Sequence, residues 1–216
     1  GLATGSTPLG IYKQLVNWYQ KGDIDFRDIR SVNLDEYCEL SPEDPQSYHY
    51  YMQENFFKYV NFQRKNIQIP NGLANDIEEE CVRYDKIILD VGGIDLQLLG
   101  LGNTGHIGFN EPDQCFDKMT HRVKLSSQTI TDNSRFFKSM DEVPRHAITM
   151  GIKAIMQARK ILLVVNGDNK SEILEKVLFG PVTPEVPASI LQLHPNVIVI
   201  ADEDALSTIR LQHPNL

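Results

Sequence analysis

The residues from Leu98 to Pro112 combine side chains that could move protons with a backbone that a ligand can approach closely. They read Leu-Leu-Gly-Leu-Gly-Asn-Thr-Gly-His-Ile-Gly-Phe-Asn-Glu-Pro and leave a largely apolar run, Ile94–Leu101, that predicts a buried strand. The glycines predict an irregular turn, because glycine adopts positive φ angles without steric penalty. In this turn, His106 offers an imidazole for proton transfer near neutral pH, and Glu111 offers a carboxylate that could orient it.

Two other interpretations of this stretch compete with a proton-transfer site. Gly100–Gly105 matches the G-x-G-x-x-G fingerprint of dinucleotide-binding proteins, which must open a helix and be followed by an acid about 20 residues later. Gly108 and Pro112 argue against a helix, and the residues near position 120 are not acidic. The other alternative is a structural turn with a surface histidine. The density of glycine, histidine and glutamate favours a functional site over both.

A turn near the start of the sequence is suited to binding an anion. Gly5, Ser6 and Thr7 precede a predicted helix, where free backbone N–H groups and hydroxyls attract phosphate. The turn is not a Walker A loop, because the lysine that such a loop requires is absent. Ordinary capping by Ser6 or Thr7, with Pro8 as the first helical residue, is the alternative.

Two cations could complete such a phosphate site. Arg135 stands in Asn-Ser-Arg-Phe-Phe, and the planar fork of donors in its guanidinium suits a phosphate. Lys170 follows Gly-Asp-Asn at the predicted start of another helix. The helix macrodipole disfavours a lysine at that position, which supports a functional role.

A carboxylate suited to act as a base is Asp35, which follows the predicted strand Ile29–Leu34 and precedes Glu36. In parallel α/β sheets, ligand groups gather beyond the carboxyl ends of strands, so Asp35 is expected to face a site. An acid in a surface turn is the alternative.

The spacing of apolar residues predicts the elements that must position these groups. Helices are expected from Pro8 to Gly22, from Asp44-Pro45 to about Val60, over 76–89, from Met140–Pro144 to about Ala158, from 168 onward, and after a cap at 202–204. Strands are expected at Ile29–Leu34, Ile67–Ile69, Ile94–Leu101, His121–Leu125, Ile161–Val165 and Val197–Ile200. This alternation indicates an α/β fold, a Rossmann-like three-layer sandwich with a mostly parallel sheet.

Two helical features have simple interpretations. The aromatic residues of the helix that ends near Val60 are interpreted as core and interface rather than as a cofactor site. The three consecutive glutamates at 78–80 are interpreted as a solvated helix face.

Length, charge and cysteine content limit the classes of partner. The 216 residues are 41% hydrophobic, enough to bury a core in a single domain over residues 1–216. A formal net charge of −8 argues against nucleic acid or an anionic membrane as partner. The cysteines at 38, 81 and 115 are scattered and odd in number, which favours a reducing, cytoplasmic location. The sequence shows no signal peptide and no run of 18 apolar residues.

The segments 2–8, 33–37, 102–112, 133–137 and 167–170 resemble, in order, the glucosamine-6-phosphate deaminase (isomerase) family. The most specific is Gly-His-Ile-Gly-Phe-Asn-Glu-Pro at 105–112. The resemblance implies conversion of glucosamine 6-phosphate and water to fructose 6-phosphate and ammonia, without a metal or an organic cofactor. It also implies the short, monomeric type of member, acting on a small-molecule sugar phosphate.

The resemblance further implies a role for each candidate residue. His106 would move the proton that opens the pyranose ring, with Glu111 holding and charging its imidazole. Asp35 would carry a proton from C2 to C1 through an enolamine, before water displaces ammonia. Thr104 stands in the ring-opening cluster, where family members usually carry Asp or Asn. The phosphate would be held by Gly5, Ser6, Thr7, Arg135 and Lys170.

Besides Thr104, the sequence departs from the family pattern at both ends. The strand and helix that normally precede the first loop, and the C-terminal extension of the hexameric members, are expected to be missing. An enzyme for galactosamine 6-phosphate, which differs in C4 stereochemistry, stays open as an alternative. So does a sugar-phosphate-sensing domain that binds without catalysis, although Asp35, His106 and Glu111 together favour an enzyme. The 6-phosphogluconolactonases share the fold, but residues 107–112 resemble the deaminases.

Overall fold

Parallel strands build the central sheet. The computed structural model describes residues 1–214, except for the side chain of Phe136. β4 (Gln97–Leu99), β7 (Ile161–Val165) and β8 (Val197–Ala201) pair in parallel in the order β4-β7-β8. β1 (Ser31–Val32) pairs in parallel with β3 (Ile67–Gln68). The strands expected from the sequence at these places are therefore confirmed, although several are shorter than expected.

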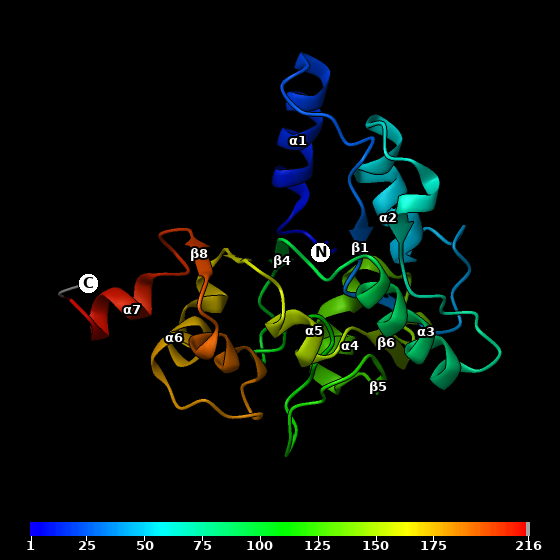
Figure 1. Ribbon diagram of the computed structural model, residues 1–216. Coiled ribbons are helices and arrows are strands. Elements are labelled where there is room, and N and C mark those ends of the chain that lie inside the picture. Colours follow the sequence, from blue (N-terminus) through cyan, green and yellow to red (C-terminus); the bar gives the residue numbers. More distant parts are fainter. Residues whose placement is uncertain (215–216) are drawn as a thin grey trace.

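The first residues of the chain join these two groups of strands. The N–H of Leu2 donates to the carbonyl of Val32 at 2.9 Å, and the carbonyl of Leu2 accepts from the N–H of Leu34 at 3.0 Å. On the other side, the N–H of Leu98 donates to the carbonyl of Gly1 at 3.0 Å. The order across the sheet is thus β3, β1, residues 1–3, β4, β7, β8, and Figure 1 shows the N-terminus beside β4.

A second, antiparallel sheet adjoins the first, and the sequence does not predict it. β2 (Asp35–Tyr37), β6 (His146–Thr149) and β5 (His121–Lys124) pair in the order β2-β6-β5. The helix expected from Met140–Pro144 onward is wrong, because β6 occupies this stretch and α5 (Ile152–Met156) begins only after it. β6 is stabilised by two strands from distant parts of the chain, and local periodicity contains no trace of such pairing.

Helices pack around both sheets (Figure 1). The remaining helices are α1 (Leu9–Lys21), α2 (Tyr48–Asn55), α3 (Ile77–Asp90), α4 (Ser127–Asn133), α6 (Ser171–Phe179) and α7 (Ser207–Gln212). Short 3₁₀ helices are η1 (Phe57–Tyr59), η2 (Arg64–Asn66), η3 (Ser134–Phe136), η4 (Met140–Glu142), η5 (Asp168–Lys170) and η6 (Pro187–Leu193). α3 confirms the helix expected over 76–89, whereas α4 was not expected.

The helix starts differ from the expected caps at two places. α1 follows Pro8 with no side-chain cap, and the Thr7 hydroxyl instead donates to Asn166 Oδ1 at 2.8 Å. α2 begins at Tyr48 and is capped by Ser47, whose hydroxyl accepts the N–H of Tyr50 at 3.1 Å. The expected start of α2 at Asp44-Pro45 is therefore wrong. The hydroxyl of Thr7 is used for a contact between loops rather than for its own helix.

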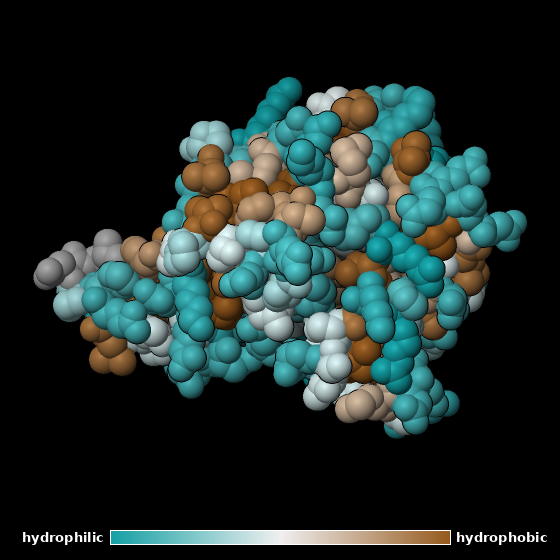
Figure 2. Space-filling view, turned by 90° about the horizontal axis from the view of Figure 1, so that it is seen from below, coloured by the Kyte–Doolittle hydropathy of each residue, from teal (hydrophilic) through white to brown (hydrophobic). Residues whose placement is uncertain are grey.

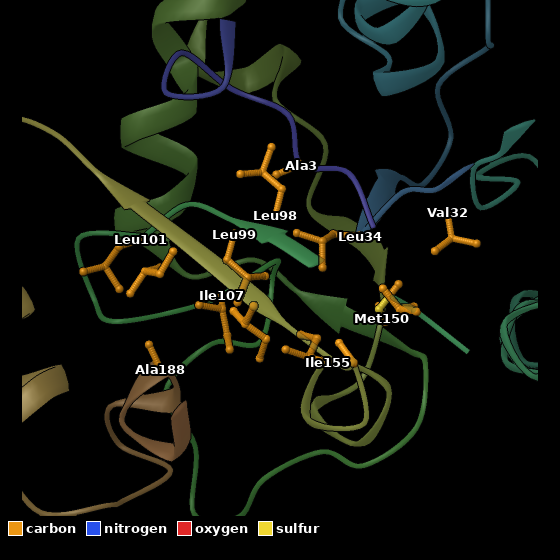
Figure 3. Close-up of a cluster of buried hydrophobic side chains, with 14 of the residues drawn as sticks. Ala3, Val32, Leu34, Leu98, Leu99, Leu101, Ile107, Met150, Ile155 and Ala188 are labelled. Atoms are coloured by element: carbon orange, nitrogen blue, oxygen red, sulfur yellow. The ribbon is translucent and has the colours of Figure 1, made fainter. Parts of the chain in front are cut away.

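The main core lies along the parallel sheet (Figure 3). Its side chains come from residues 1–3, the strands, the loops between them and the helices that cover the sheet, and include Ala3, Leu34, Leu98, Leu99, Ile107, Met150 and Ile155, the last from α5. Aromatic residues extend it: Phe56 stacks on Tyr12 with ring centroids 4.9 Å apart. Each fully buried side chain of this size contributes about 1.5–3 kcal/mol. The interpretation of the aromatic stripe as core is confirmed for Phe56 and Phe57.

The expectation of a solvated face at 78–80 is wrong for one residue. Glu80 is buried, accepts the N–H of Asn71 at 2.8 Å and pairs with Arg83 at 2.6 Å. A buried carboxylate needs such partners, and the glutamate-rich pattern does not reveal which member has them.

The fold is α/β and Rossmann-like, with a mostly parallel sheet, as the sequence predicts, plus the antiparallel sheet of β2, β6 and β5. Figure 2 shows one outer face, where hydrophilic residues predominate and hydrophobic ones form separate spots. Within residues 1–214, no helix is long and apolar enough to span a membrane.

Candidate active site

Loops from both sheets enclose a cleft of about 690 Å³. Its lining includes most of the candidates from the sequence: Gly5, Ser6, Thr7, Asp35, His106, Arg135 and Lys170. Thr104 and Glu111 lie behind His106 and contact its imidazole. The fold thus brings all of these candidates to one site, although they span more than 160 positions of sequence.

Asp35 lies where the two sheets meet. Leu34 is hydrogen-bonded to the parallel sheet, and Asp35 begins β2, opposite Thr149 of β6. The expectation that Asp35 follows the end of a strand is therefore incomplete, because the chain passes directly from β1 into an antiparallel strand. Only 6% of Asp35 is exposed. Burial, together with the negative charge of Glu36, raises the pKa of Asp35 to about 8. Once ionised, such a carboxylate is an effective base.

His106 is part of a hydrogen-bonded cluster with Thr104 and Glu111. Its Nδ1 lies 2.9 Å from Thr104 Oγ1 and 3.5 Å from Glu111 Oε2. Thr104 Oγ1 also lies 3.4 Å from Glu111 Oε2, as a donor to it. A hydroxyl has one hydrogen, so if Thr104 donates to Glu111 it must accept from Nδ1–H of His106. In the neutral form of the imidazole, this arrangement places the proton on Nδ1 and leaves Nε2 free to act as a base.

Glu111 is fixed on its other side by hydroxyls of α4 and its N-cap. Glu111 Oε1 accepts from the hydroxyl of Thr129 and, at 3.3 Å, from that of Ser126. Burial alone would raise the pKa of Glu111, but the hydrogen bond and charge of His106, with the Thr129 hydroxyl, hold it below its usual value. Glu111 is thus kept ionised, which suits a residue that orients and stabilises an imidazolium.

Position 102 requires a glycine, because the imidazole of His106 lies against its backbone. A Cβ at this position would lie 2.1 Å from Nε2 of His106 and 2.2 Å from its Cε1. The ring therefore packs directly on the backbone of the loop after β4. This loop forms turns and opens no helix, so it lacks the helix that the dinucleotide fingerprint requires.

A second part of the cleft lining carries hydroxyls, backbone and cations. Gly5 has a φ of 94°, and its carbonyl accepts from the hydroxyl of Tyr51 at 2.6 Å. Ser6 and Thr7 follow it, and Lys170 lies at the end of η5. Burial, with the neighbouring positive charge of Arg135, lowers the pKa of Lys170 to about 8, although Asp132 opposes this. The group of donors and cations is suited to a phosphate.

Several lining residues were not identified from the sequence. Tyr48 and Tyr51 of α2 face the cleft, so the aromatic stripe of this helix is only partly core. Asn103 donates to Asp132 at 2.7 Å and accepts from Asn169 at 3.0 Å. These two hydrogen bonds link the loop after β4 to α4 and to η5. The one available signal for Asn103 is its place in the glycine-rich loop, next to His106. In the described part of the chain, no cluster of His, Cys, Asp and Glu could hold a metal ion.

Comparison with known sequences identifies relatives over almost the whole chain. Residues 1–199 match the family described as glucosamine-6-phosphate isomerases/6-phosphogluconolactonase. A glucosamine-6-phosphate deaminase from Lachnoclostridium phytofermentans is 62% identical over 93% of this chain and 85% of the relative. Another, from Thermoanaerobacter pseudethanolicus, is 54% identical over 97% of this chain and 83% of the relative.

Solved structures give the same result for the fold. A monomeric glucosamine-6-phosphate deaminase superimposes with a TM-score of 0.94 at 47% identity, covering 96% of this chain and 86% of that one. The 6-phosphogluconolactonase from Trypanosoma brucei superimposes with a TM-score of 0.74 at 18% identity, covering 97% and 85%. At that identity the likeness is one of fold alone.

Proposed function

This chain belongs to the family of glucosamine-6-phosphate isomerases and 6-phosphogluconolactonases, and we infer that it is the deaminase that converts glucosamine 6-phosphate and water to fructose 6-phosphate and ammonia. The observation that carries the choice of reaction is that one cleft holds the buried carboxyl of Asp35, the imidazole of His106 and the cations Arg135 and Lys170. The carboxylate can remove a proton from carbon, and the imidazole can move the proton that opens the sugar ring. The cations can bind the phosphate.

Substrate binding begins at these two cations. We propose that Arg135 and Lys170 pair with the phosphate, while the backbone and hydroxyls of Gly5, Ser6 and Thr7 donate hydrogen bonds to it. Charge-assisted hydrogen bonds to a phosphate are about twice as strong as neutral ones, so this anchor fixes the position of the sugar. Binding also brings a negative charge to Lys170, which favours its protonated form.

Ring opening then follows at His106. Nε2 takes the proton of the C1 hydroxyl and returns it to the ring oxygen as the C1–O5 bond breaks, leaving an open-chain aldehyde. Thr104 and Glu111 hold the imidazole in the tautomer that this step needs and stabilise its transient positive charge. The imidazole ends the step as it began.

Isomerisation and deamination depend on Asp35. Its carboxylate removes the proton from C2 while the adjacent ammonium group of the sugar gives a proton to O1, which yields an enolamine. The carboxyl then returns its proton to C1, which leaves an iminium at C2. Water adds to C2 and gives a proton to the amino nitrogen. Nitrogen then departs as ammonia, and the hydroxyl left on C2 loses its proton to become the keto oxygen of fructose 6-phosphate. Before substrate binds, Asp35 is largely protonated at neutral pH, because its pKa is about 8. The ammonium group of the bound sugar is a nearby positive charge that favours the ionised carboxylate.

We further propose that the chain acts as a monomer in the cytoplasm. A solved relative of the same fold is described as a monomeric deaminase. Light scattering of the purified protein at micromolar concentration tests this, and a mass of about twice that of the chain would contradict it.

The decisive experiment measures ammonia and ketose phosphate released from glucosamine 6-phosphate and, separately, from galactosamine 6-phosphate. Asp35→Asn keeps the shape of the side chain and removes the base, so turnover is expected to fall by about 10²–10⁴-fold while the sugar phosphate still binds. Asp25→Asn, at an exposed carboxylate, is the matched control and should leave turnover unchanged. Parent protein that binds both sugars and releases no ammonia would indicate a sensing domain instead.

A further inference from the structure

Glu36, the neighbour of Asp35, has an unusually complete set of partners for a residue outside the cleft. Its carboxylate is 1% exposed. Oε1 accepts the N–H of Tyr37 at 2.8 Å and that of Tyr48 at 2.9 Å. Oε2 accepts the N–H of His49 at 2.9 Å and lies 2.8 Å from the Nδ1 of the same residue. Because side chains alternate along a strand, Glu36 lies on the face of β2 opposite to Asp35.

These contacts tie α2 to the strand that carries the proposed base. Tyr48 and His49 are the first two residues of α2, whose free N–H groups attract a negative charge. The side chain of Tyr48 packs against Tyr37 of β2, with ring centroids 4.9 Å apart, and lines the cleft. The N-terminus of α2 is therefore held at a fixed distance from Asp35.

The same helix also contacts the turn that contains Gly5. Tyr51, one turn after Tyr48, donates its hydroxyl to the carbonyl of Gly5 at 2.6 Å. Gly5, Ser6 and Thr7 form the proposed phosphate loop. Gly5 has a positive φ, so the contact with Tyr51 helps to hold an unusual backbone conformation. α2 is thus a rigid connection from the proposed base to the proposed phosphate anchor.

We propose that Glu36 is a positioning residue: its buried carboxylate fixes the N-terminus of α2 on β2, so that Asp35 and the phosphate loop keep the separation the substrate needs, and its negative charge acts on Asp35 from the adjacent position. The proposal rests on the proposed role of Asp35 as base.

The charge of Glu36 has a consequence that a purely structural residue would not have. A buried carboxylate next to Asp35 disfavours a second negative charge and is, after burial, the cause of the raised pKa of Asp35. Replacing Glu36 by a neutral residue is therefore expected to lower that pKa. A base that ionises at lower pH moves the acidic limb of the activity profile to lower pH.

The other titratable groups around this pair are identified by their contacts or by charge. They are Tyr12 of α1, Tyr37 and Cys38 at β2, Tyr48 and His49 of α2, Tyr84 of α3 and, around Cys38, Glu39, Arg122 of β5 and His146 of β6. Burial raises the pKa of each of these tyrosines and that of Cys38, the latter to about 11. The tyrosines and Cys38 therefore stay neutral across the acidic limb and do not shape it.

Glu36→Gln tests the proposal, because it keeps the length of the side chain and removes the charge. We expect the acidic limb of kcat/KM for glucosamine 6-phosphate to move down by about one pH unit. Hydrogen exchange of the Tyr48 and His49 amides should accelerate by at least about tenfold, because Gln offers one acceptor oxygen in place of two. Glu39→Gln, at an exposed acid three residues further along, is the matched control and should change neither measurement.

Glu36→Asp keeps the charge and shortens the reach, and it serves if Glu36→Gln does not fold. It should leave the acidic limb in place, raise KM by about three- to tenfold and accelerate exchange at the start of α2. The proposal would be overturned if the folded Glu36 variants had the same acidic limb, the same KM and the same exchange rates as Glu39→Gln. Hydrogen exchange needs no substrate, so it tests the anchoring of α2 even if the parent protein releases no ammonia, a result that would contradict the proposed function instead.

Discussion

At the scale of single residues, Thr104 shows how a neutral side chain can serve a charged cluster. Its hydroxyl contacts both Nδ1 of His106 and Oε2 of Glu111. A carboxylate at this position would place a second negative charge beside Glu111, whereas a hydroxyl passes a hydrogen bond from the imidazole to the carboxylate without adding charge. Glu111 is therefore the one carboxylate that contacts the imidazole in the described structure.

Replacing Thr104 by valine removes this bridge with little change in volume. Turnover is expected to fall by about 10- to 100-fold, which corresponds to the loss of one hydrogen bond to a charged group. Thr104→Ser retains the hydroxyl and should keep most of the activity. Steady-state ammonia release from both variants tests this, and equal rates for valine and serine would show that the hydroxyl takes no part.

Lys170 leads to a prediction about pH at the same scale. Asp35 and Lys170 each have a pKa of about 8. Below this pH Asp35 is protonated and cannot act as base; above it Lys170 loses the charge that attracts phosphate. The profile of kcat/KM should therefore be a narrow bell centred near pH 8. Lys170→Met is expected to lower kcat/KM and remove the contribution of Lys170 to the alkaline limb. Lys160→Met, at an exposed lysine, is the control and should leave the pH profile of kcat/KM unchanged. Titration of the substrate affects the parent and both variants equally, so it does not contribute to the difference between them.

At the scale of elements, the site depends on loops whose backbone the strands hold in place. The loop after β4 carries His106 and Thr104, and η5 after β7 carries Lys170. The two loops are linked through Asn103 and Asn169, and the loop after β7 is linked to the first turn through Thr7 and Asn166. Short loops linked in this way hold a proton-transfer group and a phosphate anchor at a constant separation.

Gly102→Ala tests the packing of the imidazole on this loop. The added Cβ would overlap the ring of His106, with its nearest atom at 2.1 Å, so the imidazole must leave its position. Turnover is expected to fall by at least about 100-fold, comparable with loss of the general base, while the folded structure is retained. Gly10→Ala is the control, because a Cβ there meets no atom within 4 Å. Normal turnover of Gly102→Ala with an unshifted thermal midpoint would contradict the placement of the ring.

At the scale of the whole molecule, a chain with a net charge of −8 binds an anion only if one region is locally positive. Arg135 and Lys170 provide this positive region in the cleft. The buried carboxyl of Asp35 lines the same cleft. Burying a carboxyl group favours its neutral form, so the fold itself is less stable whenever Asp35 is ionised.

Asp35→Asn should therefore stabilise the protein in a pH-dependent way. The folded pKa of about 8 exceeds the unfolded value of about 3.9, so the folded state binds the additional proton between these two values. The contribution of protonated Asp35 to stability is complete below about pH 4 and is lost as pH rises through about 8. The thermal midpoint of the variant, relative to the parent, should rise by several degrees between about pH 5 and pH 9. A constant difference across this range would mean that Asp35 ionises normally.

The sequence by itself determined the parts of this protein that depend on local pattern. The apolar run of β7 predicts its limits, and the spacing in α3 predicts that helix to within one residue. The glycine-rich loop indicates its irregular backbone, because consecutive turns need residues that tolerate positive φ. Residue chemistry likewise selects His106 and Asp35 as candidates, since few side chains can move protons near neutral pH.

Only the tertiary structure decided what depends on distant pairing. β6 is a strand because β2 and β5 lie on either side of it, and this pairing turns Asp35 into the cleft and Glu36 beneath α2. The partners of Glu111 are likewise supplied by the fold, because the hydroxyls of Ser126 and Thr129 reach it from another element. The physical reason is that the free energy of burying a polar group depends on the partners that surround it in space, and the folded chain supplies those partners from far along the sequence.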